Sequence, residues 1–286
     1  MTTRRPGFSL AELTVAMVVA GIIGVALARL IINQSRFVAM QDGMMRARSG
    51  ARAALNALSS ELRAVTDGGL VDAGPDSITV RVPYAFGVAC QQIFGWTIIS
   101  LLPTDSAIYR ASRASGYAWR DGTGAFRFIV QAAVIAHLSP VFCSPPADSI
   151  TTLSATGWSA NAAAIWPGAG SPPPPPIGAV VYLYQTIRYA FAESFEIPGR
   201  RALWRTVLST GGTRDELVAP FDSSAKFQFL VGGAYTLQSA PPAVLDSVRG
   251  VRVKLVGASE TAPQARSQPV TFDLTTDILF RNNARQ

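Results

Sequence analysis

Hydrophobic and polar residues follow three different patterns along the chain. Residues 8–32 are almost entirely apolar, residues 33–67 place apolar side chains at intervals of three and four, and residues 68–286 contain short runs that alternate apolar and polar side chains. The first two patterns are typical of a helix, and the third is typical of half-buried strands. The sequence therefore predicts an α+β fold, in which one long N-terminal α-helix packs on an antiparallel β-sheet head domain.

The second half of the predicted helix carries one apolar face. Side chains three and four positions apart lie above one another on a helix, so we interpret this face as a core contact with the head. Asp67-Gly68-Gly69 ends the pattern, because glycine commonly terminates helices, and we expect the helix to run from about Ser9 to about Thr66. The apolar face consists of Met44, Ala47, Ala51, Leu55, Leu58, Leu62 and Val65, and the charged residues Arg46, Arg48, Arg52, Glu61 and Arg63 are expected on other faces.

The head domain is predicted from its alternating runs and its turn residues. Pro198-Gly199-Arg200-Arg201 separates two of the runs and is typical of a β-hairpin turn. Residues 157–178 are rich in alanine, glycine and proline, so we expect an exposed loop with polyproline character there, with Trp158 and Trp166 holding it to the domain. The predicted strands cover residues 78–82, 180–195, 202–208, 227–231, 251–255 and 270–274.

The apolar segment is long enough to cross a membrane and contains one carboxylate. A helix over residues 8–32 is about 37 Å long, against about 30 Å for the hydrocarbon core of a bilayer. Arg4 and Arg5 precede it, which favours a cytoplasmic N-terminus and a head outside the cytoplasm, and Arg29 can extend toward the far interface. An ionised Glu12 in lipid costs roughly 3 kcal/mol, so this residue is a candidate for function.

The N-terminus combines a short basic leader that ends in glycine with a phenylalanine and, four residues later, a glutamate, in the order Arg4, Arg5, Gly7, Phe8, Ser9, Leu10, Ala11 and Glu12. This arrangement resembles the N-terminus of type IV prepilins and type II secretion pseudopilins. The resemblance implies that residues 1–7 are a leader peptide, that a prepilin peptidase cleaves between Gly7 and Phe8, and that Phe8 is then N-methylated. It also implies that Glu12 pairs with the terminal amine of a neighbouring subunit during assembly.

The other end of the chain has a second, weaker similarity. Val248 to Val256, and then Val270 to Phe280 followed by Arg281-Asn282-Asn283, is similar to the end of the PilW and GspJ groups of minor pilins and pseudopilins. Together the two resemblances imply a minor pilin or pseudopilin. Such a subunit is a single-pass protein of the inner (cytoplasmic) membrane that is later built into a type IV pilus or a type II secretion pseudopilus, at or near its tip.

The resemblance also implies the partners that such a subunit meets during processing and assembly. They are other pilins or pseudopilins, the prepilin peptidase/N-methyltransferase, the inner-membrane assembly platform, and membrane lipid before extraction. Nucleic acid is a further candidate, because the formal net charge is +7. The sequence leaves open whether the machine serves a pilus, secretion or competence.

Other interpretations of the same residues remain open. Ala26-Leu27-Ala28 also fits the cleavage site of a secretory signal, although the apolar segment is longer than a signal core and Glu12 has no use in one. An uncleaved anchor with no filament role is a further alternative. A tip adhesin or DNA-uptake receptor would use the Pro-rich loop or a region rich in arginine and aromatic residues, which we interpret as solvated strand faces. That region comprises Arg110, Arg113, Arg120 and Arg127, with Tyr109, Tyr117 and Trp119.

The residue inventory argues against catalysis. The chain has one histidine, His137, which lies in an apolar run, and two cysteines, Cys90 and Cys143. In an oxidising compartment we expect the cysteines to form a disulfide, the alternative being two small buried residues. Asp72 and Asp76 are interpreted as turn residues rather than calcium ligands. We expect no enzymatic activity, no cofactor and no metal site.

Overall fold

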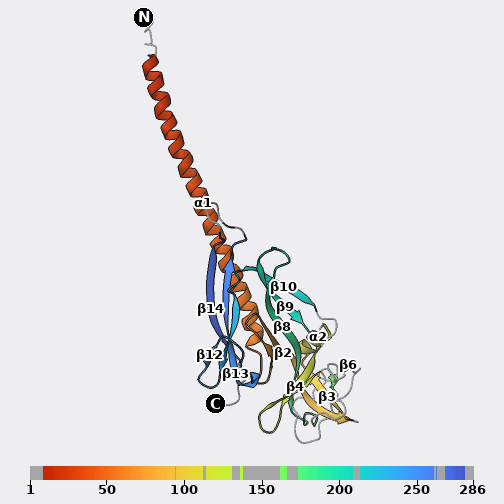
Figure 1. The fold of residues 1–286 in the computed structure, drawn as a ribbon. Coiled ribbons are helices and arrows are strands. Elements are labelled where there is room, and N and C mark those ends of the chain that lie inside the picture. Colours follow the sequence, from red (N-terminus) through yellow and green to blue (C-terminus); the bar gives the residue numbers. More distant parts are fainter. Residues whose placement is uncertain are drawn as a thin grey trace.

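The fold combines one long helix with one large antiparallel sheet. The computed structural model describes residues 9–93, 95–111, 114–130, 136–137, 162–165, 173–208, 213–260, 262 and 268–280. Helix α1 (Leu10–Leu62) projects from the head over its first half and lies along the sheet over its second half (Figure 1). The predicted α+β class and the long helix are confirmed.

Helix α1 ends slightly earlier than the sequence predicted. Its last α-helical residue is Leu62, whereas the pattern continued to Thr66. The chain then continues in narrower turns of 3₁₀ type, in which the Ala64 N–H donates to the Glu61 carbonyl at 3.0 Å and the Val65 N–H donates to the Leu62 carbonyl at 3.2 Å. Bonds of this i→i+3 type are common at helix ends, and they keep Val65 on the apolar face beyond the end of the helix.

The sheet follows the order β12-β11-β13-β10-β9-β8-β2-β3-β7-β6, with β14 on β13, β1 on β2, and β4 between β8 and β5. Every predicted strand overlaps an observed one. The strands are β1 (Leu70–Ala73), β2 (Ser77–Ile93), β3 (Trp96–Leu101), β4 (Gly116–Arg120), β5 (Phe126–Val130), β6 (Ala136–His137), β7 (Ala162–Ile165), β8 (Val180–Glu193), β9 (Arg201–Val207), β10 (Arg214–Phe221), β11 (Lys226–Val231), β12 (Thr236–Gln238), β13 (Val248–Ala258) and β14 (Thr271–Leu279); the short helices are α2 (Pro103–Ala111) and η2 (Leu245–Ser247).

The described residues of the head form two hydrophobic cores that share strands β2 and β8. Val80 pairs with Ile187 in the core next to α1, and Ala85 pairs with Leu183 in the core remote from it. The register shifts between Pro83 and Ala85, which is a β-bulge. Because a bulge adds one residue to one strand, it changes the alternation of β2 and keeps its apolar side chains on the same side as those of β8.

We call these the helix-side core and the distal core. The distal core lies with β3 and β4 at the end of the head farthest from the N-terminus (Figure 1). The helix-side core is larger and buries aromatic residues of several strands against α1. Its members include Ala51, Ala54, Leu58, Leu62, Val65, Ile78, Val80, Tyr189, Phe191, Phe221, Phe227, Phe229, Val251, Val253 and Leu255, and those of the distal core include Ala85, Ala89, Ile99, Leu101, Tyr117, Trp119, Ile129, Ala163, Ile165, Val181 and Leu183.

Part of the predicted Pro-rich loop is a buried strand, so that prediction is wrong in part. Residues 162–165 form β7, which pairs with β3, and Ala163 and Ile165 are fully buried in the distal core. Small alanine side chains fit between packed strands, a use that composition alone does not distinguish from a flexible linker. Toward the end of the predicted loop, the carbonyl of buried Pro175 accepts a hydrogen bond from Gln92 at 2.9 Å. Trp158 and Trp166 lie outside the described residues.

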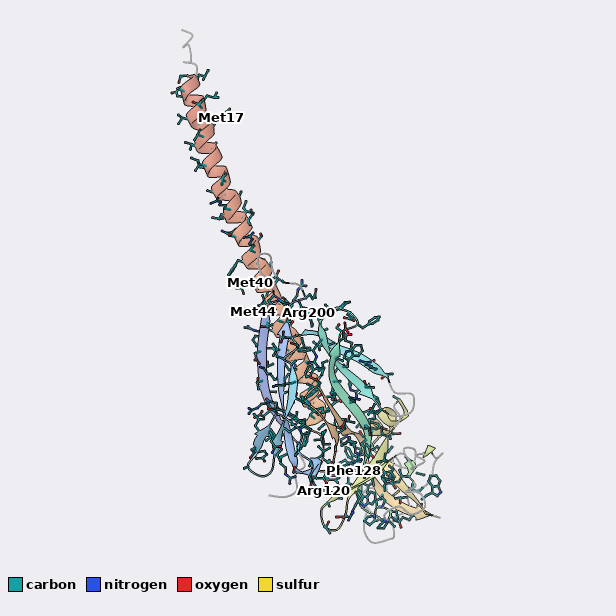
Figure 2. All side chains as sticks on the ribbon, viewed as in Figure 1. Met17, Met40, Met44, Arg120, Phe128 and Arg200 are labelled. Carbon is teal, nitrogen blue, oxygen red and sulfur yellow. The ribbon has the colours of Figure 1, made fainter. Side chains whose placement is uncertain are left out.

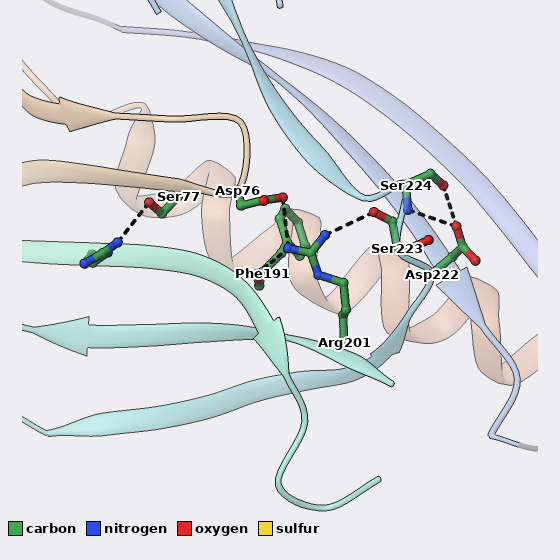
Figure 3. A network of polar contacts seen from close by, with 8 residues as sticks. Asp76, Ser77, Phe191, Arg201, Asp222, Ser223 and Ser224 are labelled. Carbon is green, nitrogen blue, oxygen red and sulfur yellow. Dashed lines mark hydrogen bonds and ion pairs between the residues drawn. The ribbon is translucent and has the colours of Figure 1, made fainter. Parts of the chain in front are cut away.

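A network centred on Arg201 ties together the turns at one end of the helix-side core (Figure 3). The Arg201 guanidinium donates to Asp76 Oδ1 at 2.9 Å, to the Ser223 carbonyl at 3.0 Å, and to the Phe191 carbonyl. Asp76 is therefore a turn residue, as predicted, and joins β1–β2 to β9. Asp72 is not, because it lies in β1 and pairs with Thr79, so its assignment to a turn is wrong.

Helix α1 and strand β13 approach each other closely at a glycine. A Cβ atom built on Gly257 would lie 2.2 Å from the carbonyl oxygen of Ala47, a distance that real Cβ atoms do not adopt. One turn closer to the N-terminus of α1, a Cβ on Gly43 would lie 3.2 Å from the Cβ of Ser259. Small residues on both elements therefore set the distance between the helix and the sheet.

The Gly257→Ala substitution should force α1 away from β13. We expect it to lower the free energy of unfolding of the full chain in detergent by about 1–3 kcal/mol, the range found when a packed core is overfilled. Denaturant titration followed by circular dichroism measures the change. Gly233→Ala is the matched control, because a Cβ at Gly233 meets no atom within 4 Å. Equal stability of the two variants would contradict the close contact.

Candidate functional site

The first half of α1 exposes apolar side chains on all sides. No other helix among the described residues is long and apolar enough to cross a membrane, and the candidate span in α1 has none of its residues buried in the protein. In Figure 2 side chains such as Met17 project from the free part of the helix. Apolar surface of this extent needs cover from lipid or from another protein. The large exposed apolar residues of this half are Leu10, Leu13, Val15, Met17, Val18, Val19, Ile22, Ile23, Val25, Leu27, Leu30, Ile31, Ile32, Phe37 and Val38.

Charged residues limit the apolar part of the helix at both ends. Because α1 is continuous from Leu10, the rise per residue places Arg29 about 25 Å along the axis from Glu12. This separation is close to the thickness of a bilayer core, about 30 Å. The geometry therefore suits a membrane-spanning segment with Glu12 near one interface and Arg29 near the other. The predicted boundaries of residues 8–32 and 33–67 stay predictions.

Glu12 closes the N-terminal turn of α1. Its carboxylate accepts a hydrogen bond from the Ser9 N–H at 2.9 Å, and the Glu12 N–H donates to Ser9 Oγ at 3.2 Å. This reciprocal pair is a capping box, in which two otherwise unpaired backbone donors are satisfied. Glu12 therefore has a structural partner within its own chain. Gly7 and Phe8 lie outside the described residues, so the cleavage and methylation sites stay predictions.

The second half of α1 is buried on the predicted face. Ala47, Ala51, Leu58, Leu62 and Val65 are at most 2% exposed, which confirms the face as a core contact. The remaining members, Met44 and Leu55, are partly buried, and Ala54 is a buried residue of this face that the pattern did not include. The charged residues Arg46, Arg48, Arg52 and Arg63 are exposed, as predicted.

Glu61 is the exception among the charged residues of the helix. It was expected on a face away from the core, but it is only partly exposed and its carboxylate accepts hydrogen bonds from Arg205 on β9 at 3.2 Å and 3.3 Å and from the buried Tyr189 hydroxyl on β8. Burial and the adjacent Glu61 carboxylate raise the pKa of Tyr189, so this hydroxyl remains a donor. The three side chains fasten the end of α1 to the sheet by charge-assisted bonds.

In the head region that is rich in arginine and aromatic residues, the described side chains of these two kinds have partners within the head or are buried in it. Arg127 donates to Asp121 at 2.7 Å, Arg120 lies over the ring of Phe126 at 4.9 Å, and Tyr117 is fully buried in the distal core. Arg120 and Arg127 lie on strands, as predicted. Arg110 lies in α2, so its assignment to a strand face is wrong, and Arg113 lies outside the described residues.

The cysteines and the histidine are described only in part. Cys90 is buried on β2 and is disulfide-bonded. Cys143 lies outside the described residues, so its pairing with Cys90 stays a prediction. His137 is in β6, where it pairs with Ala163, but its side chain is not described. Over the part of the chain that is described, no group of three histidine, cysteine or acidic side chains lies close enough to hold a metal ion.

Searches of protein-family models, of curated proteins and of solved structures found no match for this chain. The interpretation of α1, whose first half is apolar and exposed and whose second half is buried against the sheet, therefore rests on the sequence and the structure alone.

The buried tyrosines predict a loss of stability in alkali. Tyr117, Tyr184 and Tyr189 are at most 1% exposed, and burial raises the pKa of Tyr184 to about 12 and raises the pKa values of the other two further. Their folded-state pKa values lie above the unfolded value of about 10, so their contribution is complete below that pH and is lost as the pH rises above it. At about pH 11 each tyrosine should cost about 1.4 kcal/mol of unfolding free energy.

Urea titrations of the full chain in detergent, at about pH 8 and about pH 11, measure this loss. Tyr184→Phe removes one titrating group and should reduce the pH dependence by about one third. A free energy of unfolding that does not change between the two pH values would contradict the prediction.

Proposed function

We propose that the protein is a minor pilin or pseudopilin. It is held in the inner membrane by the first half of α1, processed between Gly7 and Phe8, and then assembled into a type IV pilus or type II secretion pseudopilus at or near its tip. The observation that carries the proposal is the apolar, fully exposed helix half, which continues without a break into a half buried against a β-sheet head. The N-terminal residues Arg4 to Glu12 add the resemblance to prepilins.

A filament explains features that a simple anchor leaves unexplained. The helix continues beyond Arg29 before it meets the head near Gly43, and within this part Phe37 and Val38 are 59% and 55% exposed. If residues 8–32 cross the membrane, these side chains lie outside it, and lipid does not cover them. Neighbouring helices in a filament would cover them. A carboxylate at Glu12 is also useful in a filament, because it can attract the terminal amine of a neighbour. At a distance of about 4 Å and an effective dielectric constant of about 20, the Coulomb energy of such a pair is about 4 kcal/mol before the cost of desolvation.

The leader should be absent from the mature protein. Mass spectrometry of the N-terminal peptide from native membranes or filaments is expected to show a chain that begins at N-methylated Phe8. A chain that retains Arg4 and Arg5 would overturn the proposal. A chain that begins at Arg29 would instead support a secretory signal cleaved after Ala28.

The charge of Glu12 and its capping role can be separated by substitution. Glu12→Gln keeps an acceptor for the Ser9 N–H, since glutamine also completes a capping box, but removes the charge. Ser9→Ala removes the hydroxyl acceptor and keeps the charge. If the charge aligns subunits, Glu12→Gln should reduce incorporation into filaments at least tenfold, a loss of about 1.4 kcal/mol, while Ser9→Ala should leave most of it.

The amount of each variant in sheared or purified filaments, relative to its amount in the membrane, measures incorporation. Normal incorporation of Glu12→Gln would show that the charge has no role in assembly. A larger defect for Ser9→Ala than for Glu12→Gln would assign the function of Glu12 to helix capping.

A further inference from the structure

The loop between β8 and β9, residues 194–200, carries the most exposed large apolar side chain among the residues that the structure describes. Phe195 is 85% exposed, slightly more than Leu10 at the free end of α1, which is 83% exposed. Single exposed apolar residues are common on protein surfaces. Phe195 differs from them because the loop that presents it is held by several hydrogen bonds.

Glu216 on β10 fixes the loop from the side. Its carboxylate accepts hydrogen bonds from the Phe195 N–H at 2.7 Å and from the Ser194 hydroxyl. The same hydroxyl accepts from the Ile197 N–H at 2.9 Å, and Gly199 supplies a positive φ of 77° that closes the turn. Because the backbone is already ordered, a partner that covers Phe195 would lose little additional conformational entropy on binding.

The loop lies at the end of the head from which α1 emerges. It leads into Arg201, which pairs with Phe221, and Phe221 pairs with Gly257, which contacts Ala47 of α1. Figure 2 places Arg200 close to the level of Met44 along the helix. The loop is thus near the point where the exposed half of α1 begins.

This position is too far from the membrane for Phe195 to enter lipid. Ala47, which is level with the loop, lies about 22 Å along the helix axis beyond Ile32, the last residue of the predicted membrane segment. A neighbouring subunit can reach the loop. In a filament of parallel helices in which this subunit lies just below the tip, a neighbour displaced toward the tip by about 14–55 Å places a part of its own exposed segment, Leu10–Val38, at the level of Ala47.

We propose that loop 194–200 is a docking site for the apolar N-terminal helix of a neighbouring filament subunit, with Phe195 buried against that helix. The inference rests on the proposed function and names the contact by which the head takes part in assembly. An aromatic side chain that becomes fully covered on binding is a common anchor of a protein–protein contact. The contact would also cover part of the neighbour's apolar surface, in addition to the part that neighbouring helices cover, once the neighbour leaves the membrane.

A photo-crosslinking amino acid at position 195 of the full chain tests the proposal in cells that assemble the filament. We expect a covalent adduct with a filament subunit, and mass spectrometry should map it to that subunit's apolar N-terminal helix. The same amino acid at Val244 is the control. Val244 is 63% exposed but directly precedes η2, whose Asp246 lies near Gly68 beyond the opposite end of α1, so it should give no adduct with that helix.

Phe195→Ala supplies a second measurement without placing the fold at risk, since the side chain contributes little to the core. Incorporation into filaments should fall about tenfold or more, whereas membrane level and N-terminal processing should stay unchanged. An adduct with lipid or with a head domain, no adduct, or normal incorporation of Phe195→Ala would overturn the inference. Failure of the proposed function has a different signature, namely a wild-type chain that is unprocessed or absent from filaments.

Discussion

The apolar surface of α1 between Leu10 and Val38 has to be kept from water, because its side chains are exposed around the whole helix. Lipid can cover the part between Glu12 and Arg29, whose length is close to that of a bilayer core. The helix continues for about 21 Å from Arg29 to Gly43 before it meets the head. It is therefore longer than a membrane span requires, and another protein would have to cover its apolar side chains if the chain left the membrane.

The head depends on the same helix, which is also part of its core. Small residues allow Ala47 to contact Gly257, and the apolar face that follows supplies one wall of the helix-side core. The ion pair of Glu61 with Arg205 then fastens the last turns to the sheet. Because α1 is one continuous helix, a contact that fixes its first half also fixes the orientation of the head. None of the described residues of the distal core belongs to α1.

The elements with a regular pattern could be predicted from the sequence, and those that depend on distant residues could not. The buried face of α1 follows from spacings of three and four, and β13 follows from the alternation of Val251 and Val253 with charged residues. Strand β7 was mistaken for loop, since its alanines carry no alternation and are recognisable only beside β3. Glu61 was expected on an exposed face because its partner Arg205 is far away in the sequence, so the spacing of residues along the helix does not indicate the contact.

The candidate site around Glu12 could be predicted from the sequence in part, and the rest depends on the structure. The position of Glu12 can be read from the chain, but its bond to the Ser9 N–H depends on the geometry of the first helical turn. Ser9 follows Phe8 in the sequence, so the carboxylate is hydrogen-bonded to the residue next to the predicted cleavage site. A buried charge is tolerated only with a partner. The capping bond provides a hydrogen-bond partner for the Glu12 carboxylate within the monomer, so the group is bonded before any second subunit is present.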